Sequence, residues 1–325
     1  MIHVGVDDGY RETKLAWMEN GTVRTLKVPS LVRVGPLGVT DFDGNLSGIE
    51  TEGTVYSVGD FRDGENTRFT DYPTSPLVRA LVHHALVLAG FSGKAVTIAT
   101  GLPPRDAFLA DGRKNGELIA RKIARFALPV RFQDGREPAR VTHHRVCTQG
   151  IGALLDYLTD EREIRELSGP VGVVDVGGRT TDVAVVMAGE RGLAIDHARS
   201  GSENVGILDI LDDLSREIRM TERTGVLPLY ALESALATGR IRLSGQDRDV
   251  SELVTEAKSR TRERVARAVS ILLGETADLE TILFAGGGAL ALPDLLSRYP
   301  QAVTLPDPQF ANARGFLKSL RIEGA

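Results

Sequence analysis

The segment 171–187, with the sequence VGVVDVGGRTTDVAVVM, constrains the fold of this chain more than any other. Two runs of β-branched residues flank a glycine pair, which predicts a β-hairpin. The first run holds a carboxylate, Asp175, and the glycines lack Cβ atoms, so backbone N–H groups can approach an anion closely. Hydroxyl groups follow at Thr180 and Thr181. A phosphate ester with its metal ion requires such groups, although the segment taken alone is more typical of an ordinary glycine-rich turn.

The segment 1–17 has the same design. A short apolar strand over residues 2–6 ends at Asp7 and Asp8, Gly9 makes the turn, and residues 12–17 lead back out. Two strand–Asp–Gly–strand hairpins indicate two similar half-molecules that each present a loop to one shared ligand.

A third glycine cluster, Gly286 to Gly288, follows an apolar strand over residues 281–284. We expect it to open a helix that begins near Leu290. Such a strand-to-helix turn can receive an adenosine or phosphate group, because the first N–H groups of a helix point toward its N-terminal end.

Taken in order, these segments resemble the motifs of the actin-like ATPase superfamily, which includes actin, the large heat-shock chaperones and the sugar kinases. The resemblance covers nearly all of the chain and rests on five segments: VDDGYRETK at 6–14, QGIGA at 149–153, DVGGRTTD at 175–182, FAGGGA at 284–289 and FANARG at 310–315. The nearest likeness is to the bacterial ParM/StbA proteins, which segregate plasmids. This nearer likeness also rests on the segments VHHA at 82–85, ATGLP at 99–103 and VTEA at 254–257.

The resemblance implies an α/β, actin-like (ribonuclease H-like) fold of two similar α/β domains with a nucleotide cleft between them. Domain I would span residues 1–158, with a small insertion subdomain at about 31–75, and the C-terminal helix 310–325 would complete it. Domain II would span residues 159–309. The charged stretch 159–169 would be the crossing between the domains.

The resemblance also implies roles at the site. Asp7 and Asp175 would hold Mg²⁺, mainly through water, and Lys14 would contact the phosphates of ATP or ADP. Gln149 would orient the attacking water, as a Gln does in GTPases, so that Gln149 and Asp175 are the expected catalytic residues. The expected nucleotide-binding residues are Asp7, Gly9, Tyr10, Lys14, Gly177, Gly178, Arg179, Thr180, Gly206, Gly286, Gly287 and Gly288.

Two positions depart from the family pattern. Tyr10 stands where a small residue or Ser commonly follows the first glycine, which puts a hydroxyl contact to the terminal phosphate in doubt. Arg179 stands where the second loop often has Gly or Thr, and it could clamp a phosphate bidentately or point into solvent.

Hydrophobic periodicity predicts further elements between the motifs. We expect helices over 76–89, 111–126, 150–158, 207–218 and 250–272, a strand over 95–99, a strand over 192–199, and paired strands over 130–132 and 139–146. The helix over 250–272 carries a basic face, which is most simply a solvated surface and alternatively a face toward a partner or the nucleotide.

Composition restricts the compartment and the partners. The chain of 325 residues has 42% hydrophobic residues, one cysteine, Cys147, and a net charge of −5. A single cysteine favours a reducing compartment, and we expect a cytoplasmic protein without a membrane segment. Net negative charge argues against strong direct binding to DNA, whose affinity depends on phosphate neutralisation.

These features favour an ATPase that polymerises with ATP into dynamic filaments for plasmid partition. Its expected partners are further copies of itself and a DNA-binding adaptor at a centromere-like site. A sugar or acid kinase of the same superfamily is the main alternative, although no acceptor-binding signature is evident. A cell-division or cell-shape scaffold would need an amphipathic terminal helix, and a chaperone would need a substrate-binding β domain; neither is expected here.

Overall fold

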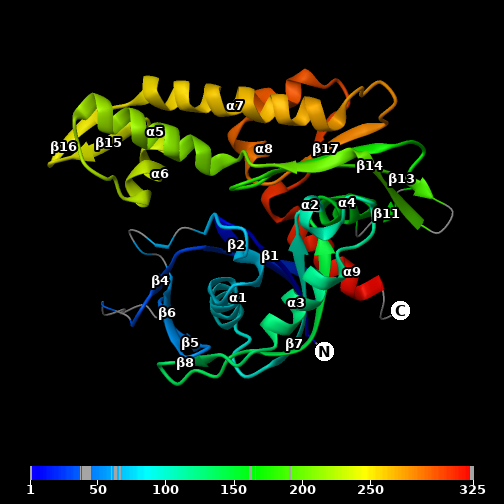
Figure 1. Cartoon of the computed structure of the whole chain (residues 1–325), viewed down its shortest axis with the longest axis horizontal. Helices are drawn as coiled ribbons and strands as arrows, with labels where there is room; N and C mark the ends of the chain where they lie inside the picture. Colours follow the sequence, from blue (N-terminus) through cyan, green and yellow to red (C-terminus); the bar gives the residue numbers. More distant parts are fainter. Residues whose placement is uncertain are drawn as a thin grey trace.

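The computed structural model describes residues 2–36, 38, 45–59, 61, 64–65, 67–160, 163–164, 166–189 and 192–322. Two five-stranded sheets, each covered by helices, form two lobes that lie side by side (Figure 1). Parts of the expected insertion at 31–75, and the last three residues of the expected helix 310–325, fall outside the described residues. No helix in the described part is long and apolar enough to span a membrane.

The first lobe is built on a sheet with the strand order β3-β2-β1-β7-β9. The first three strands form an antiparallel meander, and β7 and β9 then run parallel to β1. The strands are β1 (Ile2–Asp8), β2 (Glu12–Glu19), β3 (Thr22–Pro29), β7 (Ala95–Leu102) and β9 (Arg140–Thr148).

The second lobe repeats this arrangement. Its sheet has the order β14-β13-β12-β17-β18, again with an antiparallel meander followed by two parallel strands. The strands are β12 (Val171–Val176), β13 (Thr181–Gly189), β14 (Gly192–Glu203), β17 (Thr281–Ala285) and β18 (Ala302–Thr304). Both predicted hairpins are therefore confirmed, and each sheet directs its first hairpin turn toward the other lobe.

A smaller four-stranded sheet, of order β4-β6-β5-β8, flanks the first lobe. It consists of β4 (Val32–Val34), β5 (Ser47–Thr51), β6 (Thr54–Val58) and β8 (Arg131–Phe132). The predicted pairing of strands 130–132 and 139–146 is wrong, because β8 pairs with β5 while β9 pairs with β7. Helix α1 (Pro76–Leu88) packs between this small sheet and the five-stranded sheet of the first lobe. The Ser75 hydroxyl caps the helix by accepting a hydrogen bond from the N–H of Val78.

Helix α3 (Gly116–Phe126) is shorter than the predicted helix over 111–126. Its N-terminus is set at Asn115, whose side chain accepts from the N–H of Leu118, and the preceding residues form a turn instead. The short α2 (Pro104–Ala107) precedes this turn, and η1 (Tyr72–Thr74) precedes α1.

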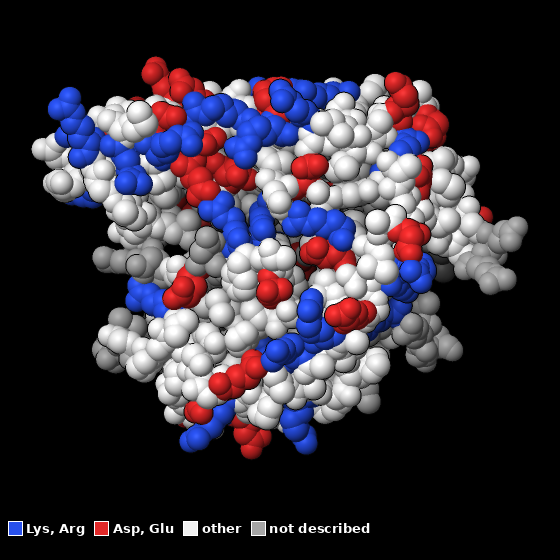
Figure 2. All heavy atoms as spheres, viewed as in Figure 1, with Lys and Arg blue, Asp and Glu red and all other residues white. Residues whose placement is uncertain are grey.

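Two long helices, α5 (Ile207–Glu222) and α7 (Ser251–Leu273), cover one face of the second sheet (Figure 1). Between them the chain forms α6 (Leu229–Thr238) and the hairpin β15 (Arg240–Leu243) and β16 (Gln246–Asp249). Three of the five basic residues of α7 pair with acids on neighbouring elements: Arg260 with Glu217, Arg264 with Asp209, and Arg262 with Asp294. On the face seen in Figure 2, basic and acidic side chains accordingly lie among one another.

The third glycine cluster opens a helix as expected, but the helix begins at Gly288 and not near Leu290. Helix α8 (Gly288–Ala291) makes a single turn, and Pro293 then begins a 3-10 segment, η2 (Pro293–Arg298). Proline lacks the N–H that would continue the α-helix, which accounts for the early end.

The crossing between the lobes consists of α4 (Ile151–Leu158), a short ladder of β10 (Thr159–Asp160) with β11 (Glu163–Ile164), and α9 (Ala311–Ile322), which follows η3 (Pro308–Phe310). Helix α9 packs on β1 and on α4 so closely that glycine is required at both crossings. A Cβ atom on Gly5 would overlap the backbone of Ala313, and one on Gly315 would overlap the backbone of Gly152. These contacts place α9 between β1 and α4.

Candidate active site

The two hairpin turns, the end of β9 and the end of β17 converge on one cavity between the lobes. Because β1 and β9, and likewise β12 and β17, run parallel, their carboxyl ends lie on the same edge of each sheet. The cavity is lined by Asp7, Gly9, Tyr10, Arg11, Glu12, Lys14, Gln149, Asp175, Gly177, Gly178, Thr180, Asp182, Ile207, Gly286 and Gly287.

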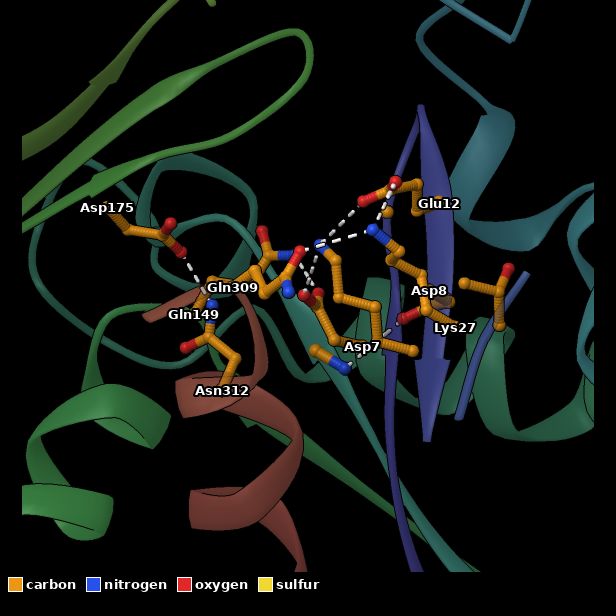
Figure 3. A network of polar contacts seen from close by, with 12 residues as sticks. Asp7, Asp8, Glu12, Lys27, Gln149, Asp175, Gln309 and Asn312 are labelled. Atoms are coloured by element: carbon orange, nitrogen blue, oxygen red, sulfur yellow. Dashed lines mark hydrogen bonds and ion pairs between the residues drawn. The ribbon is translucent and has the colours of Figure 1, made fainter. Parts of the chain in front are cut away.

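Asp7 is the centre of the polar contacts on the side of the first lobe (Figure 3). Its cross-strand partner in β2 is Lys14, whose Nζ lies 3.4 Å from Asp7 Oδ2 and 3.9 Å from Glu12 Oε2. Gln149, which directly follows β9, donates from Nε2 to Asp7 Oδ1 at 3.1 Å. The amide of Gln149 is thereby oriented, and its Oε1 is the atom able to accept a hydrogen bond from a water.

Asp175 occupies the equivalent position in the second lobe and is buried. Its Oδ2 accepts a 2.5 Å hydrogen bond from Asn312 Nδ2, and Asn312 Oδ1 accepts from the N–H of Gly150 at 3.0 Å. Asn312 thus ties β12, α4 and α9 together (Figure 3). Burial raises the pKa of Asp175 to about 6, and the nearby Asp7 contributes in the same direction.

Asp182 is a further buried carboxylate at the cavity, opposite Asp175 in the β12–β13 ladder. The Thr180 hydroxyl donates to its Oδ2 at 2.9 Å, and the hydrogen bonds of Ser202 and Thr180 with this carboxylate oppose the rise of its pKa. Burial, and secondly the charge of Asp175, raise the pKa of Asp182 to about 7. In the described part of the chain, Asp175 and Asp182 thus accept hydrogen bonds from neutral groups, and neither forms an ion pair with a basic side chain.

A buried ion pair holds the end of β1, the first strand of the first hairpin. Lys122 on α3 is fully buried, and its Nζ donates to Asp8 Oδ2 at 2.7 Å and to the carbonyl of Gly101 at 2.6 Å. Burial raises the pKa of Asp8, and the charge of Lys122 opposes that shift. The pair fixes the ends of β1 and β7 relative to α3.

Glycine is required where the loops touch. Gly286 has φ +78°, and a Cβ there would collide with Asp175 and with the backbone of Val176. A Cβ on Gly206 would lie 2.7 Å from the carbonyl oxygen of Gly177. The first N–H groups of α5, those of Ile207 and Leu208, donate to the carbonyls of Gly177 and Gly178. They hold the second hairpin turn in place instead of pointing into the cavity.

The cavity brings together eleven of the predicted site residues: Asp7, Gly9, Tyr10, Lys14, Gln149, Asp175, Gly177, Gly178, Thr180, Gly286 and Gly287. Arg179, Gly206 and Gly288 do not line it. Gly288 packs against Val176, and Arg179 contacts residues of the first lobe. Its guanidinium donates to the carbonyl of Phe69 at 3.1 Å and lies 4.9 Å from the centre of the Tyr10 ring.

Sequence reasoning missed four polar groups at the site. Arg11, Glu12, Asp182 and Asn312 all lie in the segments that carry the resemblance, but no role at the site is predicted for them. The cross-strand register was the signal that could have found Asp182, because it stands seven residues after Asp175 as Lys14 stands seven after Asp7.

The donor set fits Mg²⁺ shared with a polyphosphate. Four carboxylates line the cavity, those of Asp7, Glu12, Asp175 and Asp182, against two basic side chains, those of Arg11 and Lys14. Among the described residues no group of three or more His, Cys, Asp or Glu side chains is arranged to hold a metal by itself. Mg²⁺ commonly uses one or two carboxylates and takes its remaining ligands from phosphates and water.

Two sequence models of protein families match successive parts of the chain. Residues 2–160 match the sequence model of the N-terminal domain of the plasmid segregation protein ParM, and residues 173–298 match that of the C-terminal domain of archaeal MreB-like actin homologues. The chain belongs to the actin-like superfamily. The predicted actin-like α/β fold is thereby confirmed.

Individual relatives of this actin-like chain span its full length. An archaeal actin homolog of Thermoplasma volcanium is 26% identical, covering 97% of this chain and 98% of the relative. The crystal structure of an archaeal actin homolog in complex with ADP has a TM-score of 0.78 at 23% identity, covering 99% and 100% of the two chains. A 15-stranded ParM filament from Clostridium botulinum has a TM-score of 0.78 at 19% identity, covering 99% of each chain.

Proposed function

We propose that this protein is an ATPase that binds ATP with Mg²⁺ in the cavity between its lobes and polymerises in the ATP-bound state into dynamic filaments. One observation carries the proposal. Two equivalent hairpins from two sheets of the same topology place Asp7 and Asp175 on one cavity, together with Gln149 and the Gly286 turn. The ADP complex of an archaeal homolog and the ParM filament support it.

In this proposal the two turns bind the phosphates. The backbone N–H groups around Gly9 and Gly178, and the ammonium of Lys14, supply donors to phosphate oxygens. Asp7 and Asp175 would hold Mg²⁺, which neutralises developing charge on the transferred phosphoryl group. The remaining predicted contacts, those of Arg179, Gly206 and Gly288, stay predictions.

Gln149 would orient the attacking water. Its Nε2 is held by Asp7, so its Oε1 can accept from a water beside the terminal phosphate. An amide does not titrate and cannot act as a strong base, and we therefore expect slow hydrolysis that serves as a timer for the filament.

Hydrolysis of ATP by the purified protein tests the assignment of the site. Asp175→Asn retains the shape of the side chain and an acceptor for Asn312, yet it removes a metal-directed charge. We expect turnover to fall about a hundredfold or more with an unchanged melting temperature. Asp247→Asn on the exposed hairpin β15–β16 is the control, with wild-type turnover expected. Full turnover in Asp175→Asn would show that the site is misassigned.

Plasmid partition is the process that we propose for the filament, on the strength of the ParM match over residues 2–160. With a net charge of −5, the protein should reach DNA through a basic adaptor in the cytoplasm. Fluorescence anisotropy with labelled duplex DNA tests this: tight, salt-sensitive binding by the protein alone would make the adaptor unnecessary. We retain the domain boundaries 1–158 and 159–309 as part of the proposal.

A further inference from the structure

Arg11 stands at the tip of the first hairpin, between the cavity and the facing lobe. It lines the proposed nucleotide cavity and also the larger groove that adjoins it. Its Nη2 donates to Glu233 Oε1 on α6 at 3.1 Å. Its Nε is buried and has no hydrogen-bond partner among the described residues. One guanidinium therefore contacts the second lobe with one nitrogen and keeps a donor uncommitted with another.

The base of this side chain is fixed by the second hairpin. A Cβ atom on Gly178 would lie 2.8 Å from the Cβ of Arg11, so the two turns touch at this point and only glycine fits. Arg11 consequently lies where both proposed phosphate loops meet. Other side chains also bridge the lobes nearby: Arg68 Nη1 lies 2.5 Å from Asp212 Oδ2, and Arg179 stacks on the Tyr10 ring.

Charge balance favours Arg11 as a phosphate ligand. Lys14, the other basic side chain at the cavity, already lies close to Asp7 and Glu12. The side chain of Glu233 is 40% exposed, and ion pairs of such exposure contribute little net stability by themselves. A planar guanidinium can donate to a phosphate along one edge while another N–H holds a carboxylate.

We propose that Arg11 bridges the terminal phosphate of the nucleotide and Glu233, so that phosphate binding reinforces the contact between the lobes. A free N–H of the guanidinium would donate to the phosphate while Nη2 keeps Glu233. Glu233 is then a positioning residue, because it acts on the nucleotide only through Arg11. This inference rests on the proposed ATP site and deepens it.

The test measures the affinities of the full-length protein for a non-hydrolysed ATP analogue and for ADP, by displacement of a fluorescent nucleotide in the presence of Mg²⁺. Arg11→Gln should weaken binding of the ATP analogue about tenfold or more, and of ADP less, as expected for loss of a charge-assisted hydrogen bond. Glu233→Gln should weaken binding of the ATP analogue by a smaller factor. The double variant should match Arg11→Gln, because Glu233 has no effect without Arg11.

Two further variants separate this role from a structural one. Arg11→Lys keeps the charge but lacks the planar guanidinium that donates in two directions. It should therefore bind the ATP analogue more weakly than wild type, and adding Glu233→Gln should not change that affinity. Arg24→Gln removes an ion pair of the same length, 3.1 Å to Glu19, away from the cavity, and wild-type affinities are expected.

Unchanged affinities in Arg11→Gln, or an equal effect of Glu233→Gln with and without Arg11, would overturn the bridge while leaving the ATP site standing. If Arg11→Gln fails to fold, Arg11→Lys gives the same comparison. Absence of any nucleotide binding by the unsubstituted protein would overturn both the bridge and the proposed function.

Discussion

Asp7 and Asp175 hold the same position in two copies of one hairpin, yet their surroundings differ. Asp7 faces Lys14 across the strand pair, whereas Asp175 faces a second carboxylate, Asp182. The first lobe thus offers a cation beside its carboxylate, and the second lobe offers two buried acids with raised pKa values. This asymmetry suits a ligand that carries both an anionic phosphate and a divalent cation. In our proposal, Lys14 of the first lobe contacts the phosphate, and the carboxylates of both lobes hold the cation.

Gln149 gives the sharpest prediction at the residue scale. Gln149→Ala should lower kcat for ATP hydrolysis by roughly ten- to a thousandfold, because a group that positions water is lost, while ATP binding persists. Phosphate release and nucleotide displacement measure the two quantities separately. Gln246→Ala, at the exposed start of β16, serves as the control. Loss of ATP binding along with turnover would assign Gln149 a structural role instead.

His144 predicts how stability depends on pH. It is buried in β9, its Nε2 lies 2.9 Å from the Thr100 hydroxyl, and burial lowers its pKa to about 3, with Lys122 and His143 contributing. The folded pKa lies below the unfolded value of about 6.5, so the unfolded chain takes up the proton first as the pH falls. This contribution to stability is complete above about pH 6.5 and is lost toward pH 3.

Between about pH 6.5 and pH 5, His144 alone should cost about 2 kcal/mol of unfolding free energy, at about 1.4 kcal/mol per pH unit. Urea denaturation at both pH values measures this. His144→Gln should lose less stability than wild type over the interval, and the exposed neighbour His143→Gln should behave like wild type. Equal losses in wild type and His144→Gln would show that other groups carry the pH dependence.

At the scale of elements, α9 determines how the lobes are joined. It crosses β1 at Gly5 and α4 at Gly315, and it supplies Asn312 to Asp175 and to the N-terminus of α4. The helix therefore connects the packing of the first lobe with a carboxylate of the second. A change in the position of β12 would be transmitted to α4 through one amide group.

Gly5→Ala tests this packing, since the added Cβ would overlap the α9 backbone. We expect a loss of about 1–3 kcal/mol of stability in urea denaturation, as found for overpacked interiors. Gly116→Ala, at the first position of α3, meets no atom within 4 Å and should leave stability unchanged or slightly higher. Comparable stabilities for the two variants would mean that α9 moves away at little cost.

Local pattern was sufficient for the hairpins and for α1, α5 and α7, because strands, glycine turns and helical stripes are encoded by neighbouring residues. Most residues of the cavity lining were expected only from the resemblance to the actin-like motifs. Local pattern failed where the answer depends on distant partners. The pairing of β8 with β5 joins segments about eighty positions apart, and Glu233 contacts Arg11 at a separation of 222 positions. The start of α8 at Gly288, two residues before the expected start near Leu290, is a local difference.

At the scale of the molecule, the two lobes contact each other through α9, through α2 against β14, and through side-chain pairs near the cavity. Arg11 with Glu233, and Arg68 with Asp212, bridge the side away from α9. A nucleotide among these contacts would change how firmly the lobes are held together. In our account this is how ATP promotes assembly and how hydrolysis promotes disassembly.

Sedimentation and light scattering of the purified protein with Mg²⁺ and ATP, ADP or a slowly hydrolysed ATP analogue test the central claim most directly. We predict polymer with ATP, longer-lived polymer with the analogue, and little with ADP, whereas Asp175→Asn should form polymer that does not turn over or none at all. Equal polymer lifetimes with ATP and the analogue would contradict hydrolysis as the timer. Absence of polymer with every nucleotide would contradict the filament itself and favour a small-molecule kinase.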